Sequence, residues 1–244
     1  MNSITINSKY LPLCQNIENI FKESENSIHK ARNEIKIVTH ESEELVIKAF
    51  KIPHIINKIA YGFFRSSKAE KSYVNSLKII EFVPQPIAYI EEKKFGLLYK
   101  SYFISEHFAY DFTIRELLTN KDFENKKEIY HTFANFTTQL HNQGIKHLDY
   151  SPGNILIKKE NDEYIFKIID INRMKFKELS TQERLENFAK LWATDEDLTI
   201  IIEEYVKLNN LDEEKSLKIA LEASQKHKNR KNFKKRLKGK KVVD

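Results

Sequence analysis

The chain has 244 residues, with 41% hydrophobic and 31% charged side chains, a composition ordinary for a packed globular protein of one large domain or two small lobes. Its only cysteine, Cys14, excludes an intramolecular disulfide and a multi-cysteine zinc site, and is expected to be a small buried hydrophobic residue. The formal net charge is +6, but residues 226–244 contain ten Lys or Arg and one Asp, a local net of +9, which leaves −3 for residues 1–225. Such a mildly acidic body argues against a nucleic-acid-binding surface, and no nucleic-acid partner is expected.

No targeting or membrane-spanning segment is predicted. The first fifteen residues carry polar side chains where a secretory signal needs an unbroken apolar run. Apolar runs such as 198–202 are far shorter than the roughly 20 residues that cross a bilayer. Together with the low cysteine content, these features predict a cytoplasmic protein.

The first hundred residues are predicted to form strands interrupted by helices. Alternating apolar residues at 34–39 and a second β-rich run at 45–50 flank a polar turn, which predicts a hairpin with Lys48 in its second strand. Two helices and two more strands are expected next: helices at 52–63 and 67–80, and strands at 87–90 and 97–103. The apolar stripe of 52–63 is predicted to pack on its own domain, and the alternative is a membrane-surface helix.

The pattern after residue 105 is mainly helical. Helices are expected at 113–118 and 126–143, a hairpin at 155–158 with 164–169, and further helices that start at Ser180, Thr194 and Asp212. Gly144 suits the end of the longest of these helices. The predicted organisation is an N-terminal lobe at 1–104, a helical C-terminal lobe at 105–225 and a basic tail at 226–244.

A polar stretch between these elements carries the chemistry. His147-Leu148-Asp149-Tyr150-Ser151-Pro152-Gly153-Asn154 has the spacing His-x-Asp-x-x-x-x-Asn, and Asp170 ends the apolar strand that follows. Phosphoryl transfer needs a carboxylate near the acceptor hydroxyl, oxygen ligands for Mg²⁺ and a cation on the phosphates. A surface turn is the plain alternative, since Asp, Ser, Pro, Gly and Asn are common loop residues. The second Asp and the strand lysine Lys48 favour the phosphate-transfer interpretation.

Six stretches then carry a resemblance to a known family: Leu45 to Phe50, Phe64 to Ala69, Pro84 to Ala88, His147 to Asn154, Asp170 to Arg173, and Asn232 to Arg236. In these stretches the chain resembles the lipopolysaccharide kinase (Kdo/WaaP) family. The resemblance implies an α+β fold, bilobal and protein-kinase-like, with an antiparallel-sheet N-lobe and a mainly helical C-lobe. It also implies phosphorylation of an inner-core sugar, Kdo or heptose, with ATP and Mg²⁺.

The resemblance assigns roles to the motif residues. Asp149 would be the catalytic base that accepts the proton of a sugar hydroxyl. Asn154 and Asp170 would hold Mg²⁺. His147 is expected to support the backbone rather than to act chemically.

The resemblance also places Lys48 on the α and β phosphates of ATP. Glu70 is the best candidate for the glutamate that pairs with this lysine. Ser72 and Val74 remain alternative matches to that family position.

Two departures from protein kinases bear on the acceptor. No glycine precedes Gly62, so the nucleotide-covering turn, placed at 23–27, lacks the Gly-x-Gly-x-x-Gly pattern. No proline follows Pro152, so the Ala-Pro-Glu of a peptide-docking segment is absent. These departures favour a small or lipid-linked sugar over a protein acceptor. An aminoglycoside-type phosphotransferase and a non-catalytic kinase-like binding protein stay as alternatives.

The basic tail suggests a second kind of contact. Basic residues near an anionic membrane leaflet contribute about 1 kcal/mol each, so the tail could hold the protein where a lipid-linked sugar is presented. The alternative is a solvated helix end. Phe233 and Leu237, four residues apart, predict that part of the tail packs on the fold.

Overall fold

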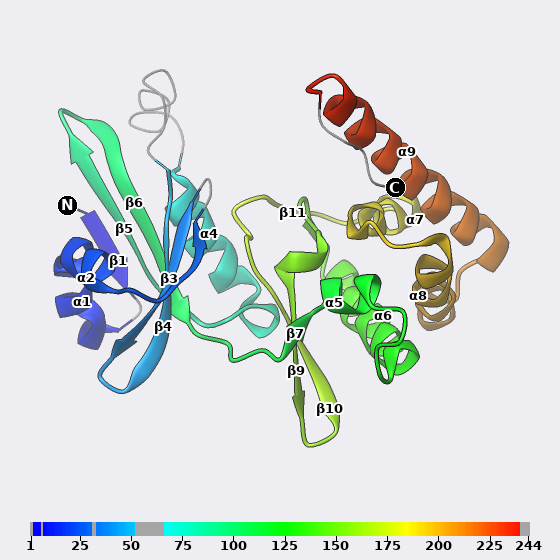
Figure 1. Ribbon diagram of the computed structural model, residues 1–244, viewed down its shortest axis with the longest axis horizontal. Helices are drawn as coiled ribbons and strands as arrows, with labels where there is room; N and C mark the ends of the chain where they lie inside the picture. The colour runs from blue at the N-terminus through cyan, green and yellow to red at the C-terminus, as the bar shows by residue number, and fades with distance from the viewer. Residues whose placement is uncertain (1, 6, 31–32, 52–65, 240–244) are drawn as a thin grey trace. The chain divides into compact units, whose positions relative to one another are not determined.

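The structure is a computed structural model that describes residues 2–5, 7–30, 33–51 and 66–239 (Figure 1). The chain separates into two compact units, residues 1–109 with 170–173 (unit 1), and residues 110–169 with 174–244 (unit 2). The helix expected at 52–63 lies outside the described residues. The lobe limits predicted at 104 and 225 stay predictions.

Unit 1 is built on one antiparallel sheet. Its elements are β1 (Asn2–Thr5), η1 (Ser8–Tyr10), α1 (Leu11–Gln15), α2 (Ile17–Glu23), β2 (Ser27–Lys30), β3 (Glu34–His40), β4 (Glu43–Ala49), α4 (Lys68–Lys78), η2 (Ile80–Phe82), β5 (Pro86–Lys94) and β6 (Leu97–Glu106). The six strands follow the order β1-β5-β6-β4-β3-β2, and every neighbouring pair is antiparallel. The predicted hairpin is confirmed as β3 and β4, in which Val38 pairs with Leu45.

The two faces of this sheet meet different helices. Leu45 and Ile47 of β4 are fully buried in a cluster that includes Leu13 and Ile17 of α1 and α2. Side chains alternate along a strand, so Lys48 lies on the opposite face. Figure 1 shows α4 on the side of the sheet away from α1 and α2. The alternation of β4 therefore buries an apolar core on one side and presents a lysine on the other.

Helices α1 and α2 are not predicted from the sequence, and their presence changes the meaning of residues 23–27. Glu23 ends α2 and Ser27 begins β2, so this segment joins a helix to a strand. The nucleotide-covering turn predicted at 23–27 is therefore not a turn between two strands. The buried Lys36 ammonium donates to the carbonyls of Phe21 and Ser24, both at 2.7 Å, which satisfies acceptors at the end of α2. Residues 31 and 32, between β2 and β3, lie outside the described residues.

Unit 2 is mainly helical. Its elements are β7 (Phe112–Thr113), α5 (Ile114–Thr119), α6 (Lys126–Asn142), β8 (Ile145–His147), η3 (Pro152–Asn154), β9 (Ile155–Glu160), β10 (Glu163–Ile168), β11 (Met174–Phe176), α7 (Thr181–Leu185), η4 (Glu186–Leu191), α8 (Asp195–Asn209) and α9 (Glu213–Arg236). Strands β10, β9 and β7 form one small sheet, and β11 pairs with β8. The predicted hairpin at 155–169 is confirmed as β9 and β10.

Aromatic rings fill the core of unit 2. The Phe133 ring centroid of α6 lies 5.8 Å from that of Tyr150 and 6.3 Å from that of Phe188. Tyr205 of α8 approaches Phe188 to 5.2 Å in an edge-on arrangement. Such edge-on and offset pairs stabilise beyond the apolar area that they bury. This packing therefore holds the ring of Tyr150, a residue of the polar motif, in the core of unit 2.

The helix starts of unit 2 follow their predicted caps with one difference. Ser180 and Glu183 form both hydrogen bonds of a capping box at the start of α7. Thr194 accepts a hydrogen bond from the Asp197 N–H at 3.0 Å, but the Asp197 carboxylate pairs with Lys126 at 2.9 Å. The second predicted box is therefore only half formed, because a tertiary ion pair takes its acidic member.

The long helix α9 continues into the predicted basic tail. Its buried residues are Ser216, Ala220, Ser224 and Asn232. Phe233 and Leu237 are 62% and 72% exposed, so the prediction that this pair packs is wrong. Small and polar side chains provide the contact face instead. None of the helices in the described part of the chain is long and apolar enough to cross a membrane.

Candidate functional site

The polar motif occupies the connection between β8 and β9 in unit 2. Gly144, which ends α6, has a φ of +70°, and a Cβ there would lie 2.7 Å from the Lys177 carbonyl oxygen. Only glycine fits this turn without a clash, and the turn starts β8 in the correct direction. Pro152 opens the 3-10 turn η3, which ends at Asn154. A glycine turn thus precedes the motif, and a 3-10 turn that begins at Pro152 ends it.

His147 bridges two backbone segments. Its Nδ1 accepts a hydrogen bond from the Asp149 N–H at 2.9 Å, and its Nε2 lies 2.9 Å from the Ile169 carbonyl oxygen. A backbone N–H can only donate, so Nδ1 is the acceptor and Nε2 carries the proton that it donates to Ile169. The buried ring therefore holds Asp149 next to the residue that precedes Asp170. This is the supporting role that the sequence predicted for His147.

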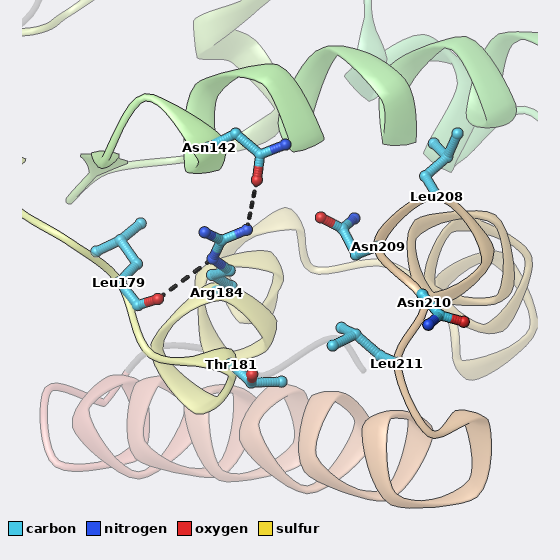
Figure 2. Close-up of a pocket in the computed structure, with 8 residues that line it drawn as sticks. All are labelled: Asn142, Leu179, Thr181, Arg184, Leu208, Asn209, Asn210 and Leu211. Carbon is cyan, nitrogen blue, oxygen red and sulfur yellow. Dashed lines mark hydrogen bonds between the residues drawn. The ribbon is translucent and has the colours of Figure 1, made fainter.

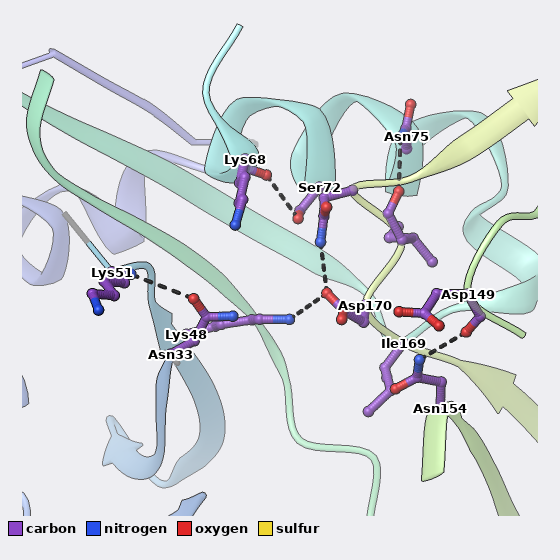
Figure 3. A network of polar contacts seen from close by, with 12 residues as sticks. Asn33, Lys48, Lys51, Lys68, Ser72, Asn75, Asp149, Asn154, Ile169 and Asp170 are labelled. Atoms are coloured by element: carbon purple, nitrogen blue, oxygen red, sulfur yellow. Dashed lines mark hydrogen bonds and ion pairs between the residues drawn. The ribbon is translucent and has the colours of Figure 1, made fainter. Parts of the chain in front are cut away.

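The Asn154 side chain has a defined orientation. Its Nδ2 donates to the Asp149 carbonyl oxygen at 2.9 Å (Figure 3). Because a carbonyl oxygen can only accept, the amide must turn its Oδ1 away from this contact. The Asn154 N–H also donates to the Ser151 carbonyl, and its own carbonyl accepts from the Ile169 N–H. An amide oxygen held in this manner is a suitable ligand for Mg²⁺.

Two residues of η4 hold the carbonyls of the same loop. Asn187 Nδ2 donates to the His147 carbonyl at 3.2 Å, and the Lys190 ammonium donates to the Leu148 carbonyl. Neither residue was singled out from the sequence, because both follow the motif by about forty residues and lie in no recognisable pattern. Packing of η4 against the loop is what brings them there.

Asp149 itself is half-buried. In the part of the chain that the structure describes, no side chain donates a hydrogen bond to its carboxylate. Both of its backbone polar groups are bonded, through His147 and Asn154. The carboxylate is therefore fixed through its backbone and has its oxygens available to accept a proton.

The side chain of Tyr150 is buried in the core of unit 2. Its ring is 1% exposed, and its hydroxyl lies 2.8 Å from Thr137 Oγ1. Burial raises the pKa of this phenol far above its usual value. Tyr150 is a core residue that anchors the loop, and it does not take part in proton transfer.

Unit 1 holds the other predicted site residues. The Lys48 ammonium pairs with Asp170 Oδ1 at 2.6 Å, although the two residues are 122 positions apart, and Asn172 Nδ2 donates to the same oxygen at 2.6 Å. Asp170 has a φ of +57°, a left-handed conformation that Asp tolerates better than most residues. Asn75 of α4 donates to the Ile171 carbonyl at 2.7 Å and fixes the following residue (Figure 3).

Glu70 does not share this ion pair. It lies half-buried in the first turn of α4, where its N–H donates to the Ser67 hydroxyl at 3.1 Å. Among the described residues the ion pair of Lys48 is with Asp170, and none joins Lys48 to Glu70. Of the alternative positions, Ser72 is buried and bonded to the Lys68 carbonyl, and Val74 is exposed. The pairing of Lys48 with Glu70 stays a prediction.

The described residues contain no cluster of three or more His, Cys, Asp or Glu that could hold a metal ion alone. Mg²⁺ in phosphate-transfer enzymes is commonly held by one or two protein oxygens and completed by phosphates and water. The Asn154 amide oxygen in unit 2 and the Asp170 carboxylate in unit 1 are each of the ligand type that this mode of binding uses. They do not fit an all-protein cage.

A separate hollow lies in unit 2 between α6, α7 and the α8–α9 connection (Figure 2). Its volume is about 440 Å³, and Arg184 crosses it to reach Asn142 Oδ1 at 2.7 Å and the Leu179 carbonyl at 3.3 Å. None of the predicted site residues lines it. Arg184 is its only charged lining residue and is bonded to Asn142 and Leu179, so we assign the hollow no chemistry.

A model of the lipopolysaccharide kinase (Kdo/WaaP) family matches residues 65–210, which include Asp149, Asn154 and Asp170 but not Lys48. The chain is also similar to a solved structure described as WaaP in complex with acyl carrier protein, with 13% identity and a TM-score of 0.60. That match covers 93% of this chain and 99% of the other, and it confirms the predicted α+β, protein-kinase-like fold. No curated protein matches the chain.

Proposed function

The chain belongs to the lipopolysaccharide kinase (Kdo/WaaP) family, whose members are phosphotransferases with a hydroxyl acceptor, and we propose that it phosphorylates a sugar of the lipopolysaccharide inner core, Kdo or heptose, with ATP as donor. The observation that supports the site most directly is the arrangement around Asp149. His147 and Asn154 bond both of its backbone polar groups and leave the carboxylate to face a substrate.

In the proposed reaction Asp149 accepts the proton of the sugar hydroxyl. The hydroxyl oxygen forms a bond to the γ-phosphorus, and the bond between that phosphorus and the β–γ bridging oxygen breaks, which releases ADP. Asn154 and Asp170 would hold Mg²⁺, which supplies charge neutralisation on the phosphates. Lys48 would contact the α and β phosphates, and Glu70 would orient Lys48 when nucleotide is bound.

Positioning is the main contribution of the protein in this scheme. Phosphoryl transfer depends on alignment and charge more than on covalent help, so a base held rigidly at the acceptor hydroxyl lowers the barrier. The hydrogen bonds of His147, Asn154 and Asn187 to the motif backbone serve that purpose.

The exposed part of α9 is the proposed contact with the anionic inner leaflet. Phe233 and Leu237 lie four residues apart on one face of the helix, which also carries exposed basic residues such as Lys226. Apolar residues beside basic ones are the pattern of helices that bind at membrane surfaces. This contact would bring the protein to a lipid-linked acceptor.

The test uses Asp149→Asn, which keeps the size of the side chain but removes its basicity. With labelled ATP and Kdo-lipid A as acceptor, we expect the rate to fall about 10²- to 10⁴-fold, the usual loss on removal of a general base. Binding of ATP should persist. Asp162→Asn is the matched control, because Asp162 is 96% exposed in the β9–β10 turn.

Acceptor range separates the alternatives. Transfer to a soluble aminoglycoside but not to Kdo-lipid A would replace the proposed function with that of a small-molecule phosphotransferase. Full activity in cells that carry Asp149→Asn would indicate a non-catalytic binding protein. Mass spectrometry of the lipid A core from cells with and without the gene would identify the sugar that loses a phosphate.

A further inference from the structure

The turn that begins at Asp170 carries a side chain where protein kinases have none. In the Asp-Phe-Gly motif of those enzymes, the residue two positions after the metal-binding aspartate is glycine. Here that residue is Asn172, and its Nδ2 lies 2.6 Å from Asp170 Oδ1. An amide N–H can only donate, so the carboxylate oxygen accepts and the amide oxygen of Asn172 faces away from this contact. The side chain at 172 therefore makes a direct contact with the carboxylate that glycine could not make.

The backbone between these two residues is held in place. Asp170 has a φ of +57°, a left-handed conformation that local hydrogen bonds of Asp and Asn side chains stabilise. Ile171 is buried, and its carbonyl accepts a hydrogen bond from Asn75 Nδ2 of α4 at 2.7 Å. These residues all belong to unit 1. Asn172 thus orients the Asp170 carboxylate from a backbone that α4 keeps in place.

Lys48 contacts the same oxygen, but its contact has a different effect on charge. Its ammonium lies 2.6 Å from Asp170 Oδ1 (Figure 3). A carboxylate oxygen has two lone pairs, and the donors from Lys48 and Asn172 use both. The ammonium repels a metal ion at this carboxylate, whereas the amide is neutral and leaves the negative charge of the carboxylate in place. In the proposed reaction Lys48 contacts the phosphates, and the contact from Asn172 is the one that is compatible with a bound metal ion.

We propose that Asn172 is a positioning residue for Asp170: its amide holds the carboxylate in the orientation that binds a divalent cation once Lys48 contacts the phosphates of the nucleotide. The proposal rests on the proposed function, because that function makes Asp170 a ligand of Mg²⁺. Removal of a hydrogen bond that orients a metal ligand typically costs about 10- to 100-fold in metal affinity. Of these two donors, Asn172 therefore strengthens metal binding and Lys48 weakens it.

The first test measures the affinity for Mn²⁺, a probe of the Mg²⁺ site, by electron paramagnetic resonance at a saturating concentration of a non-hydrolysable ATP analogue. Asn172→Ala should raise the Kd for Mn²⁺ about 10- to 100-fold. Asn172→His should keep this Kd within about threefold of that of the unaltered protein, because Nδ1 of His can carry an N–H donor at the same position along the side chain. An unchanged Kd in Asn172→Ala would overturn the proposal.

Two controls separate positioning from a general effect on the fold. In EDTA, without metal, the affinity of Asn172→Ala for the ATP analogue should stay within about twofold of that of the unaltered protein, because the residue acts on the metal ligand. The matched variant is Asn19→Ala, since Asn19 of α2 in unit 1 also donates its Nδ2 to a side-chain oxygen, Asn16 Oδ1, at 2.8 Å. It should leave the Kd for Mn²⁺ unchanged. Equal losses in the two Asn variants, or an equal loss of metal-free nucleotide affinity, would overturn the proposal.

The second test uses the opposite effects expected for the two donors. Without nucleotide, Lys48→Met should bind Mn²⁺ more tightly than the unaltered protein, since the competing ammonium is gone. The addition of Asn172→Ala to this variant should weaken the binding again by about tenfold or more. Equal or tighter binding in the double variant would overturn the proposal, because the amide would then compete with the metal as the ammonium does.

The two proposals fail in different ways. If the unaltered protein phosphorylates Kdo-lipid A and Asn172→Ala keeps its Kd for Mn²⁺, the positioning role is wrong and the kinase function stands. If the protein transfers phosphate to no inner-core acceptor, the kinase function fails, and the Mn²⁺ measurements alone support or reject the role of Asn172.

Discussion

The hydrogen bonds of His147 give the sharpest test of how the loop is held. His147→Phe keeps a planar ring in the buried position and removes both polar contacts, to the Asp149 N–H and to the Ile169 carbonyl, each 2.9 Å long. Leaving a buried donor or acceptor without a partner costs about 1 to 3 kcal/mol. For two such groups we expect the free energy of unfolding to fall by about 2 to 6 kcal/mol.

Activity should respond as well, since these contacts position the proposed base. A displacement of about 1 Å at a catalytic group can cost 10²-fold in rate, so we expect kcat for phosphate transfer to fall by about that factor. Urea denaturation gives the first quantity and steady-state kinetics the second. His131→Phe is the control, because the side chain of His131 is 40% exposed and lies in α6 outside the loop.

The two measurements can refute the reasoning separately. An unchanged unfolding midpoint in His147→Phe would mean that the ring does not satisfy these backbone groups. A loss of stability with unchanged kcat would mean that the bridge holds the fold but does not position Asp149.

Two further predictions concern buried titratable groups. Burial, with a smaller contribution from the Arg184 charge, lowers the pKa of His141 to about 3, so the unfolded chain binds a proton that the native chain does not between about pH 6.5 and 3. The stability that this group contributes is present above pH 6.5 and is lost as the pH falls. Between pH 7.5 and pH 5.0 the free energy of unfolding of the unaltered protein should fall by about 2 kcal/mol more than that of His141→Leu. An equal pH dependence of the two proteins would contradict this. Burial also raises the pKa of Cys14 to about 11, so a thiol-specific reagent at pH 8 should modify it only in denaturant, and prompt labelling of the native protein would show that the site is open.

Much of the local structure could be predicted because its signals are local. Period-two alternation located the hairpin of β3 and β4, and the spacing of Ser180 and Glu183 located the start of α7. Helices α1 and α2 were missed because five and seven residues are too few for a helical period to be visible. They form because the sheet buries Leu13 and Ile17, which is a tertiary effect.

The wrong predictions have the same origin. Phe233 and Leu237 have the spacing of a packed pair, yet α9 packs through Ser224 and Asn232. Spacing along a helix identifies which side chains share a face, and it does not identify which face meets the rest of the protein. That choice depends on the shape of the surface against which the helix lies.

The sequence by itself determined the motif and its internal geometry. Asp149 and Asn154 are five residues apart, and a turn led by Pro152 is enough to bring the Asn154 amide onto the Asp149 carbonyl. Only the tertiary structure decided which charges surround these groups. The pairing of Lys48 with Asp170 and the hydrogen bonds of Asn187 and Lys190 to the Asp149 loop join residues many tens of positions apart, and packing rather than any local pattern brings them together.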